Sequence, residues 1–254
     1  MNEDGKRLAL VVGASGYIGT NLVEFLRAEG HPVRAVSRNL EVLAGRDWDD
    51  VELCRADVLQ PDSLDVVLQD VDTAYYLVHS MAAGRGFPEL DAQAARNFAG
   101  AAARHRLRRI VYLGGLTPKD PRSKHLQSRR QTGDILREGR VPVTELRAGM
   151  IIGPGSAAWE VIRDLVNHLP VMVTPRWVSS RSTPIALSNL VHYRAAVPDH
   201  AETAGQIYDV AGPDVVTYGE IMRRYGRLVG REPVIIPVPV LTPRLSSYWL
   251  RFVT

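Results

Sequence analysis

The chain has 254 residues, 45% of them hydrophobic, and its 31 lysines and arginines against 28 aspartates and glutamates give a formal net charge of +3 at pH 7. The composition excludes a membrane span, since no stretch offers roughly 18 uninterrupted apolar residues, and an internal disulfide, since Cys54 is the only cysteine. The N-terminus is polar and shows no secretory signal, so we expect a cytoplasmic protein. Most of the basic residues are arginines, which leads us to expect a bacterial source. The length fits one sizeable domain, with or without a small lobe.

The chain opens with the pattern of a strand, a glycine turn and a helix. Leu8–Val12 is an unbroken apolar run, and a helical segment follows the turn. Between them, Gly13 permits a tight turn, Gly16 lets the backbone approach a pyrophosphate, and Gly19 lets the helix pack closely on its strand. In this context the glycines predict a dinucleotide site rather than an ordinary turn.

The end of the second predicted strand, Val33–Val36, bears on the choice of cofactor. An NAD-specific site places Asp or Glu here to accept the ribose 2′-hydroxyl, but this chain has Ser37 and Arg38 and no carboxylate before Glu41. Both side chains can bind a 2′-phosphate, and Arg34 can assist. Alternatively, Arg38 could simply be an exposed residue of a solvated loop. Its position at the end of this strand, after the glycine turn, favours the 2′-phosphate of NADPH.

The third and fourth strands are predicted over residues 51–58 and 72–81. Ligands of open α/β sheets lie at the carboxyl ends of strands, so the fourth strand should deliver His79 and Ser80 near the nicotinamide ribose. Residues 82–86 then read as a loop that can cover the cofactor.

An alanine-rich helix is predicted over residues 91–105, followed by a fifth strand over 110–113. The basic run 104–109 at the end of the helix complements the helix dipole, so we do not interpret it as a nucleic-acid site. The next helix, Ser123–Gly133, places His125 and Arg129 on one face. His125 can act as a general acid or, alternatively, bond a loop carbonyl, whereas an arginine can only hold a ribose or phosphate.

The last third of the chain is less regular. Residues 156–169 predict an amphipathic helix, and proline-punctuated segments follow from residue 170. Further on, Thr217 is predicted to cap a helix, and 234–239 is a proline-broken edge strand. No metal-ligand spacing or nucleophile elbow occurs. The amphipathic helix should bury Trp159, Ile162, Leu165 and Val166, and Trp159, Met172 and Trp177 could form an aromatic pocket or simply pack in a core.

Two motifs resemble a known family over nearly the whole chain. The Gly13-x-x-Gly16-x-x-Gly19 spacing resembles the extended and atypical short-chain dehydrogenase/reductases. The pattern Ser-x-His-Leu-x-Ser-Arg-x-x-x-Gly over 123–133 is similar to their NmrA-like, NAD(P)H-binding branch. The resemblance implies an α/β fold with a doubly wound parallel (Rossmann) sheet in residues 1–155. Residues 156–254 would then form a small substrate lobe interleaved with the last core elements.

The sequence departs from this family at its catalytic positions. Typical members place a serine after the fifth strand and a Tyr-x-x-x-Lys pair on the next helix, whereas this chain has Gly114-Gly115, His125 and Arg129. The resemblance implies catalysis at the positions of His125 and Arg129, with the proton supplied by His125 or by a water that His79 holds. It places Asp57 and Val58 against the adenine, although Asp57 could instead cap the following helix. Asn97 matches an asparagine near the family's active site, and Arg147 matches its sixth-strand pattern. The implied cofactor contacts are Gly13, Ser15, Gly16, Tyr17, Ile18, Gly19, Ser37, Arg38, Asp57, Val58, His79, Ser80, Met81, Arg129, Gly149 and Ile151.

Two functions follow from these observations. The first is an NADPH-dependent oxidoreductase acting on a small apolar or aromatic carbonyl or quinone-like substrate, with tailoring of aromatic polyketides as one form of that hypothesis. The second is a non-catalytic NAD(P)H-binding redox sensor or assembly factor, which the missing Ser, Tyr and Lys favour. Apolar side chains crowd residues 241–253, so we also expect a C-terminal extension or a protein partner that covers them.

Overall fold

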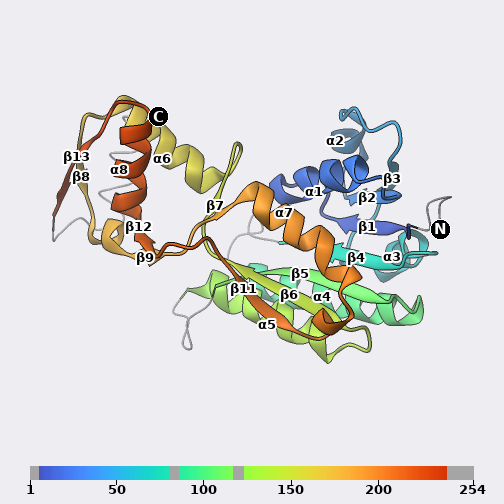
Figure 1. Ribbon diagram of the computed structural model, residues 1–254. Coiled ribbons are helices and arrows are strands. Elements are labelled where there is room, and N and C mark those ends of the chain that lie inside the picture. The colour runs from blue at the N-terminus through green and yellow to red at the C-terminus, as the bar shows by residue number, and fades with distance from the viewer. Residues whose placement is uncertain (1–5, 80–85, 117–122, 239–254) are drawn as a thin grey trace. The chain divides into compact units, whose positions relative to one another are not determined.

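The computed structural model describes residues 6–79, 86–116 and 123–238 (Figure 1). The chain divides into two compact units. The first comprises the residues up to Ala148 together with Ser188–Val210, and the second comprises Gly149–Leu187 and the residues from Ala211 onward. The chain therefore returns to the first unit after the second has begun. The expected apolar C-terminal segment, residues 241–253, lies outside the described residues.

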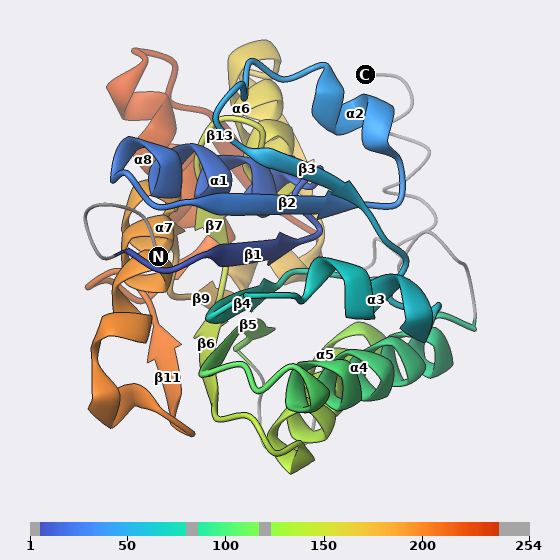
Figure 2. The same cartoon turned by 90° about the vertical axis from the view of Figure 1, so that its right-hand side faces the viewer.

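A seven-stranded parallel sheet forms the centre of the first unit, in the order β11-β6-β5-β4-β1-β2-β3. The strand order reverses between β1 and β4, which is the switch point where doubly wound sheets bind ligands. The doubly wound parallel sheet predicted from the sequence is confirmed, and Figure 2 shows β2, β1 and β4 in succession. The strands are β1 Ala9–Val12, β2 Val33–Ser37, β3 Glu52–Arg55, β4 Thr73–Tyr76, β5 Arg109–Gly115, β6 Val143–Ala148 and β11 Ile207–Val210.

Helices cover both faces of this sheet, with α4 and α5 on one face and α1 and α7 on the other (Figure 1). Successive side chains of β4 point to opposite faces of the sheet, so neighbouring residues of this strand contact different helices. The ring of Tyr76 packs on Phe98 of α4 at 5.0 Å, whereas the guanidinium of Arg194 from α7 lies 5.8 Å over the ring of Tyr75. The helices are α1 Tyr17–Ala28, α2 Leu40–Ala44, α3 Pro61–Val67, α4 Phe87–Arg104, α5 Lys124–Glu138 and α7 Leu187–Ala196.

The larger core lies on the α4 and α5 face. Leu10, Val12, Ile110 and other strand residues that point to this side are buried against the helices. Phe98 is fully buried, and burial of such a side chain stabilises the fold by about 1.5–3 kcal/mol. Alanines on α4 let that helix lie close to the sheet. This packing holds the strand ends that carry the candidate site.

The second unit is built on two helices, α6 Ala157–His168 and α8 Tyr218–Leu228, with three two-stranded ladders. The ladder of β8 Val171–Thr174 with β13 Val234–Pro237 is parallel, so the predicted edge strand is present. The other ladders join β7 Ile151–Ile152 to β10 Ile185–Ala186 and β9 Arg181–Ser182 to β12 Val216–Thr217.

Two sequence predictions for this unit are confirmed. The Thr217 hydroxyl accepts a hydrogen bond from the Glu220 backbone N–H at 3.1 Å, and the Glu220 side chain accepts one from the Thr217 N–H, which completes a capping box at α8. The apolar face of α6 is also buried, with Ile162 and Val166 in the core and Trp159 and Leu165 packed against it.

The three residues considered for an aromatic pocket behave as packing residues or surface residues. Met172 is buried in the core of this unit, and the ring of Trp159 packs edge-on against Tyr225 at 5.0 Å. Trp177 is 48% exposed beside Tyr218. In the part of the chain that the structure describes, no helix has the length and hydropathy that crossing a membrane requires.

Candidate functional site

The glycine turn between β1 and α1 has no room for a side chain at Gly13 or Gly19. Gly13 has a φ of +91°, which L side chains rarely adopt, and a Cβ there would lie 3.1 Å from the carbonyl oxygen of Leu77. A Cβ on Gly19 would lie 2.2 Å from the carbonyl oxygen of Gly13. Gly16 stands at the N-cap of α1, so no N-cap side chain covers the start of the helix. This arrangement fits the pyrophosphate of a dinucleotide.

A cavity of about 200 Å³ lies beside this turn, at the carboxyl ends of β1, β2 and β4 and the residues after β3. The structure therefore brings together predicted cofactor residues from four separate segments. Those that line the cavity are Gly13, Ser15, Gly16, Ser37, Arg38, Asp57, Val58 and His79. Tyr17, Ile18 and Gly19 form the first turn of α1.

Two residues at the end of β2, Ser37 and the exposed Arg38, line the cavity. The Ser37 hydroxyl lies 3.1 Å from that of Ser15 and accepts a hydrogen bond from the Asn39 N–H at 3.2 Å, while Arg38 is exposed. Arg34 does not line this cavity. Its guanidinium instead pairs with Glu52 at 2.8 Å and donates to the Val67 and Gln69 carbonyls at the end of α3, so it does not assist Arg38.

The residues after β3 form a hydrogen-bonded turn on the opposite wall. The Asp57 carboxylate accepts from the Leu59 N–H at 3.0 Å, and the residue that caps α3 is Gln60, so the expectation that Asp57 caps this helix is wrong. The Asn97 amide of α4 donates to the Val58 carbonyl at 3.0 Å. Asn97 thus fixes the wall of the cavity from the next helix.

His79 follows β4 and makes a contact that the sequence did not indicate. Its Nδ1 lies 2.8 Å from Oδ2 of Asp91, a buried carboxylate on α4, and the Ser128 hydroxyl of α5 donates to the same oxygen at 2.9 Å. The Nε2 atom of His79 is buried and has no hydrogen-bond partner among the described residues. An imidazole held at one nitrogen therefore stands at the edge of the cavity.

The predicted pair on α5 lies next to His79. The rings of His79 and His125 are 4.8 Å apart between centroids. Burial lowers the pKa of His125 below its usual 6.5, and the charges of Arg129 and His79 lower it further, against an opposite effect of Asp91. His125 is thus mainly neutral near pH 7.

Arg129 reaches the carboxyl end of β5. Its guanidinium donates to the Leu113 carbonyl at 3.4 Å, while its Nε is buried and makes no hydrogen bond within the described ranges. Two histidines, one carboxylate and one arginine thus gather next to the dinucleotide cavity.

Comparison with known proteins decides what this chain is. Residues 13–162, which include the glycine turn, the cavity walls and both histidines, match the family described as NAD(P)H-binding. The chain belongs to the NAD(P)H-binding family. The resemblance drawn from the sequence motifs is confirmed.

Relatives of this NAD(P)H-binding protein include named reductases. The chain is 26% identical over 247 residues to the ceramide reductase of Caulobacter vibrioides, covering 94% of this chain and 76% of the relative. It is 28% identical over 233 residues to the (4-alkanoyl-5-oxo-2,5-dihydrofuran-3-yl)methyl phosphate reductase of Streptomyces griseus, covering 88% and 74%. The triphenylmethane reductase of a Citrobacter species has the same fold, with a TM-score of 0.79 and 18% identity over 97% of this chain and 83% of that one.

The position where typical members carry a serine is filled in this NAD(P)H-binding protein by a buried ion pair. A Cβ on Gly114 would lie 2.5 Å from one carboxylate oxygen of Glu145, and one on Gly133 would lie 2.7 Å from the other. Glu145 is buried and pairs with Arg147, at 2.9 Å, and with Arg137. Gly114 and Gly133 thus make space for an ionic cluster that leaves no room for a serine at position 114.

The remaining predicted residues lie elsewhere. Gly149 and Ile151 belong to the second unit, where Ile151 pairs with Ile185 in the ladder of β7 and β10. Ser80 and Met81 fall outside the described residues, as does nearly all of the predicted loop over residues 82–86.

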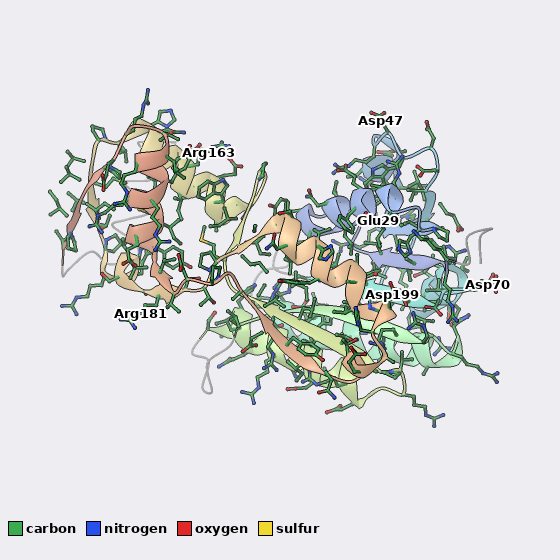
Figure 3. The ribbon with its side chains drawn as sticks, viewed as in Figure 1. Glu29, Asp47, Asp70, Arg163, Arg181 and Asp199 are labelled. Carbon is green, nitrogen blue, oxygen red and sulfur yellow. The ribbon has the colours of Figure 1, made fainter. Side chains whose placement is uncertain are left out.

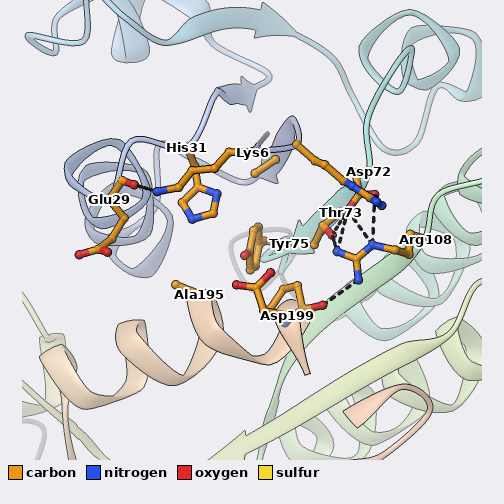
Figure 4. Close-up of a pocket in the computed structure, with 12 residues that line it drawn as sticks. Lys6, Glu29, His31, Asp72, Thr73, Tyr75, Arg108, Ala195 and Asp199 are labelled. Atoms are coloured by element: carbon orange, nitrogen blue, oxygen red, sulfur yellow. Dashed lines mark hydrogen bonds and ion pairs between the residues drawn. The ribbon is translucent and has the colours of Figure 1, made fainter. Parts of the chain in front are cut away.

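A larger cavity of about 550 Å³ opens at the amino ends of β1 and β4, on the opposite edge of the sheet (Figure 4). Three of its charged side chains, Arg7, Asp72 and Arg108, bond to one another. Asp72 accepts from Arg108 and Arg7, each at 2.8 Å, and from Thr73 at 2.9 Å. Burial raises the pKa of Asp72, but these hydrogen bonds outweigh burial and hold the pKa below its usual value. Arg108 also donates to the Pro198 carbonyl, next to Asp199 (Figures 3 and 4).

Proposed function

We propose that this protein is an NADPH-dependent reductase of a small apolar or aromatic carbonyl or quinone-like compound. The observation that carries the proposal is the placement of His79 and His125, 4.8 Å apart between ring centroids, next to the dinucleotide cavity. The named relatives, all reductases, support the same reaction class. Tailoring of aromatic polyketides is one form of the proposal.

Different residues of the chain would bind the cofactor and transfer the proton in this reaction. The glycine turn would hold the pyrophosphate, and Ser37 and Arg38 the 2′-phosphate. Arg129, which cannot act as an acid near neutral pH, would hold the ribose or a phosphate. The bound cofactor supplies a hydride. His125, in its protonated form, would donate an N–H to the carbonyl oxygen of the substrate, deliver the proton that the reduced oxygen needs and become neutral; solvent would then reprotonate it.

A second candidate is a non-catalytic NAD(P)H sensor or assembly factor. It is favoured by the exclusion of a serine beside Glu145 and by the replacement of the tyrosine and lysine by His125 and Arg129. Such a protein would keep the dinucleotide cavity and lose the chemistry. The two candidates predict the same cofactor affinity and opposite turnover.

The experiment is a panel of aromatic aldehydes, ketones and quinones assayed by oxidation of NADPH, together with calorimetric titration of NADPH. Turnover on at least one class, saturable in substrate and absent without protein, supports the reductase. Tight NADPH binding without oxidation on any member of the panel rejects the reductase in favour of the sensor. Absence of NADPH binding rejects both.

A further inference from the structure

The contacts of Asp91 determine where the proton of His79 resides. One oxygen of this buried carboxylate receives the Ser128 hydroxyl at 2.9 Å and faces Nδ1 of His79 at 2.8 Å. An ionised carboxylate only accepts hydrogen bonds, so Nδ1 must be the nitrogen that carries hydrogen. In a neutral ring, Nε2 then carries the lone pair.

No hydrogen-bond donor faces Nε2 of His79 in the part of the chain that the structure describes. The atom is buried and lacks a partner within residues 6–79, 86–116 and 123–238, although buried polar atoms are nearly always hydrogen-bonded. His79 also lines the dinucleotide cavity. A group that enters this cavity and carries a hydroxyl would satisfy Nε2, whereas a group that only accepts hydrogen bonds would not.

The surroundings of His79 hold this ring in place. Phe87 of α4 meets it edge-on at 6.1 Å, and His125 of α5 flanks it. Asp91 and Ser128 come from the same two helices, whose packing brings the three polar groups together. Neither Asp91 nor Ser128 lines the cavity, whereas His79 does, so His79 connects these two polar groups to the site.

We propose that Asp91 and Ser128 are positioning residues that fix His79 as its Nδ1–H tautomer, so that Nε2 accepts a hydrogen bond from a ligand hydroxyl. The donor is either a ribose hydroxyl of the dinucleotide or the alcohol formed from the substrate. Only the second of these donors, the alcohol formed from the substrate, rests on the proposed function. The tautomer is a property of the protein without ligand.

The test is the ¹⁵N NMR spectrum of the histidine rings in the full chain, which separates the two tautomers directly. We expect the Nδ1–H tautomer for His79 in the wild type and its loss or mixing in Asp91→Asn. The matched control is Asp65→Asn, which removes a carboxylate 3.0 Å from the imidazole of His105 at the far end of α4. That variant should leave the His79 signals unchanged. An Nε2–H tautomer in the wild type, or an unchanged His79 in folded Asp91→Asn, overturns the proposal.

Two ligand additions identify the donor. A change of the Nε2 resonance with NADP⁺ alone assigns the ribose hydroxyl, and a change only after benzyl alcohol is added to the NADP⁺ complex assigns the product side. No change with either probe overturns the acceptor role, even if the reductase activity stands. Ser128→Ala, which keeps the carboxylate, provides a second variant should Asp91→Asn fail to fold.

Kinetics separate positioning from stability. With a substrate found in the panel, we expect Asp91→Asn to lower kcat by about tenfold to a hundredfold, the equivalent of one charge-assisted hydrogen bond, with less change in the KM for NADPH. Ser128→Thr should retain most of the activity that Ser128→Ala loses. An equal loss in Asp65→Asn would indicate a structural role alone.

Discussion

The two edges of the first unit's sheet differ in how their polar groups are satisfied. At the amino edge, around the cavity of about 550 Å³, Asp72 is bonded to Arg7, Arg108 and Thr73. At the carboxyl edge, the cavity measures only about 200 Å³, yet Nε2 of His79 beside it and the nearby Nε of Arg129 are buried without a partner in the described chain. The chemistry of the walls, and not the size of the cavity, therefore marks the functional edge.

The difference follows from the architecture of a parallel sheet. At the carboxyl edge, the chain leaves β1 by a glycine turn and enters a helix whose start no N-cap side chain covers. At the amino edge, strands begin, and Arg108 links Asp72 before β4 to the Pro198 carbonyl beyond α7. The Asp72 cluster of the amino edge therefore connects segments of the fold, whereas at the carboxyl edge Nε2 of His79 and Nε of Arg129 have no hydrogen-bond partner among the described residues.

The largest effect should come from His125. We expect His125→Ala to lower turnover by about 10²–10⁴-fold, the usual contribution of a general acid, and to leave the NADPH dissociation constant within about threefold. Steady-state kinetics and calorimetry measure the two quantities. His200→Ala is the control, because this exposed histidine pairs only with Glu202. Unchanged turnover in His125→Ala would remove His125 from the mechanism.

The glycine turn should tolerate no Cβ at position 19. Because that atom would lie 2.2 Å from the Gly13 carbonyl oxygen, Gly19→Ala must displace the turn, and we expect NADPH affinity to fall by about a hundredfold, or about 3 kcal/mol. Gly100→Ala is the matched control, since its Cβ would meet only the Arg104 guanidinium at 3.8 Å. That helical substitution should preserve affinity and stabilise α4 by about 0.5–1 kcal/mol. Equal affinity in the two variants contradicts this account of the turn.

Arg38 should set the preference for NADPH over NADH. A charge-assisted hydrogen bond to the 2′-phosphate contributes about 1.5–3 kcal/mol, so we expect the wild type to bind NADPH about tenfold tighter or more. Arg38→Glu should abolish or reverse this preference, whereas Arg140→Glu, at an exposed arginine after α5, should not. Calorimetric titrations with both cofactors give the ratio. Equal wild-type affinities would show that Arg38 is merely a surface residue.

Substitutions at the amino edge should change the stability of the fold and leave cofactor binding unchanged. Asp72→Asn removes a carboxylate whose pKa is lowered, so we expect a loss of about 1–3 kcal/mol in the free energy of unfolding near pH 7 and unchanged NADPH affinity. The lowered pKa means that Asp72 stabilises the fold above its unfolded value of about 3.9, and that this stabilisation is lost as the pH falls through the lower folded value. The stability difference between wild type and variant should therefore shrink below about pH 4.

Urea unfolding at several pH values measures this difference, with Asp50→Asn as the control. Asp50 is exposed and pairs with Arg27, so that variant should cost at most about 1 kcal/mol. A loss of NADPH affinity in Asp72→Asn would break the distinction between the two edges.

Much of the carboxyl edge could be predicted from the sequence, because its determinants are local. The glycine spacing, the apolar run before it and the residues after β2 lie within one strand–turn–helix–strand segment, and the switch point of a doubly wound sheet follows from that pattern. The spacing of His125 and Arg129 on one helix is likewise local. These predictions needed no knowledge of which helices pack together.

The polar contacts across elements could not be predicted. Asp91 is one of two acids in the alanine-rich helix α4, and its contact with His79 and Ser128 depends on how α4 and α5 pack after β4. Glu145 lies in a strand of mixed polar and apolar residues, and the two glycines that face it, Gly114 and Gly133, hint at a buried ionic cluster. Pairs of glycines on a strand and the next helix, opposite a strand acid, are the signal to look for.

The central claim is that the smaller, carboxyl-edge cavity is the working site. A crystal structure of the full chain with NADP⁺ tests it most directly. The account predicts the pyrophosphate at the Gly13–Gly19 turn, the 2′-phosphate beside Arg38 and the nicotinamide ring near His79 and His125. A dinucleotide bound in the cavity around Asp72 and Arg108, or a nicotinamide ring remote from both histidines, would contradict it.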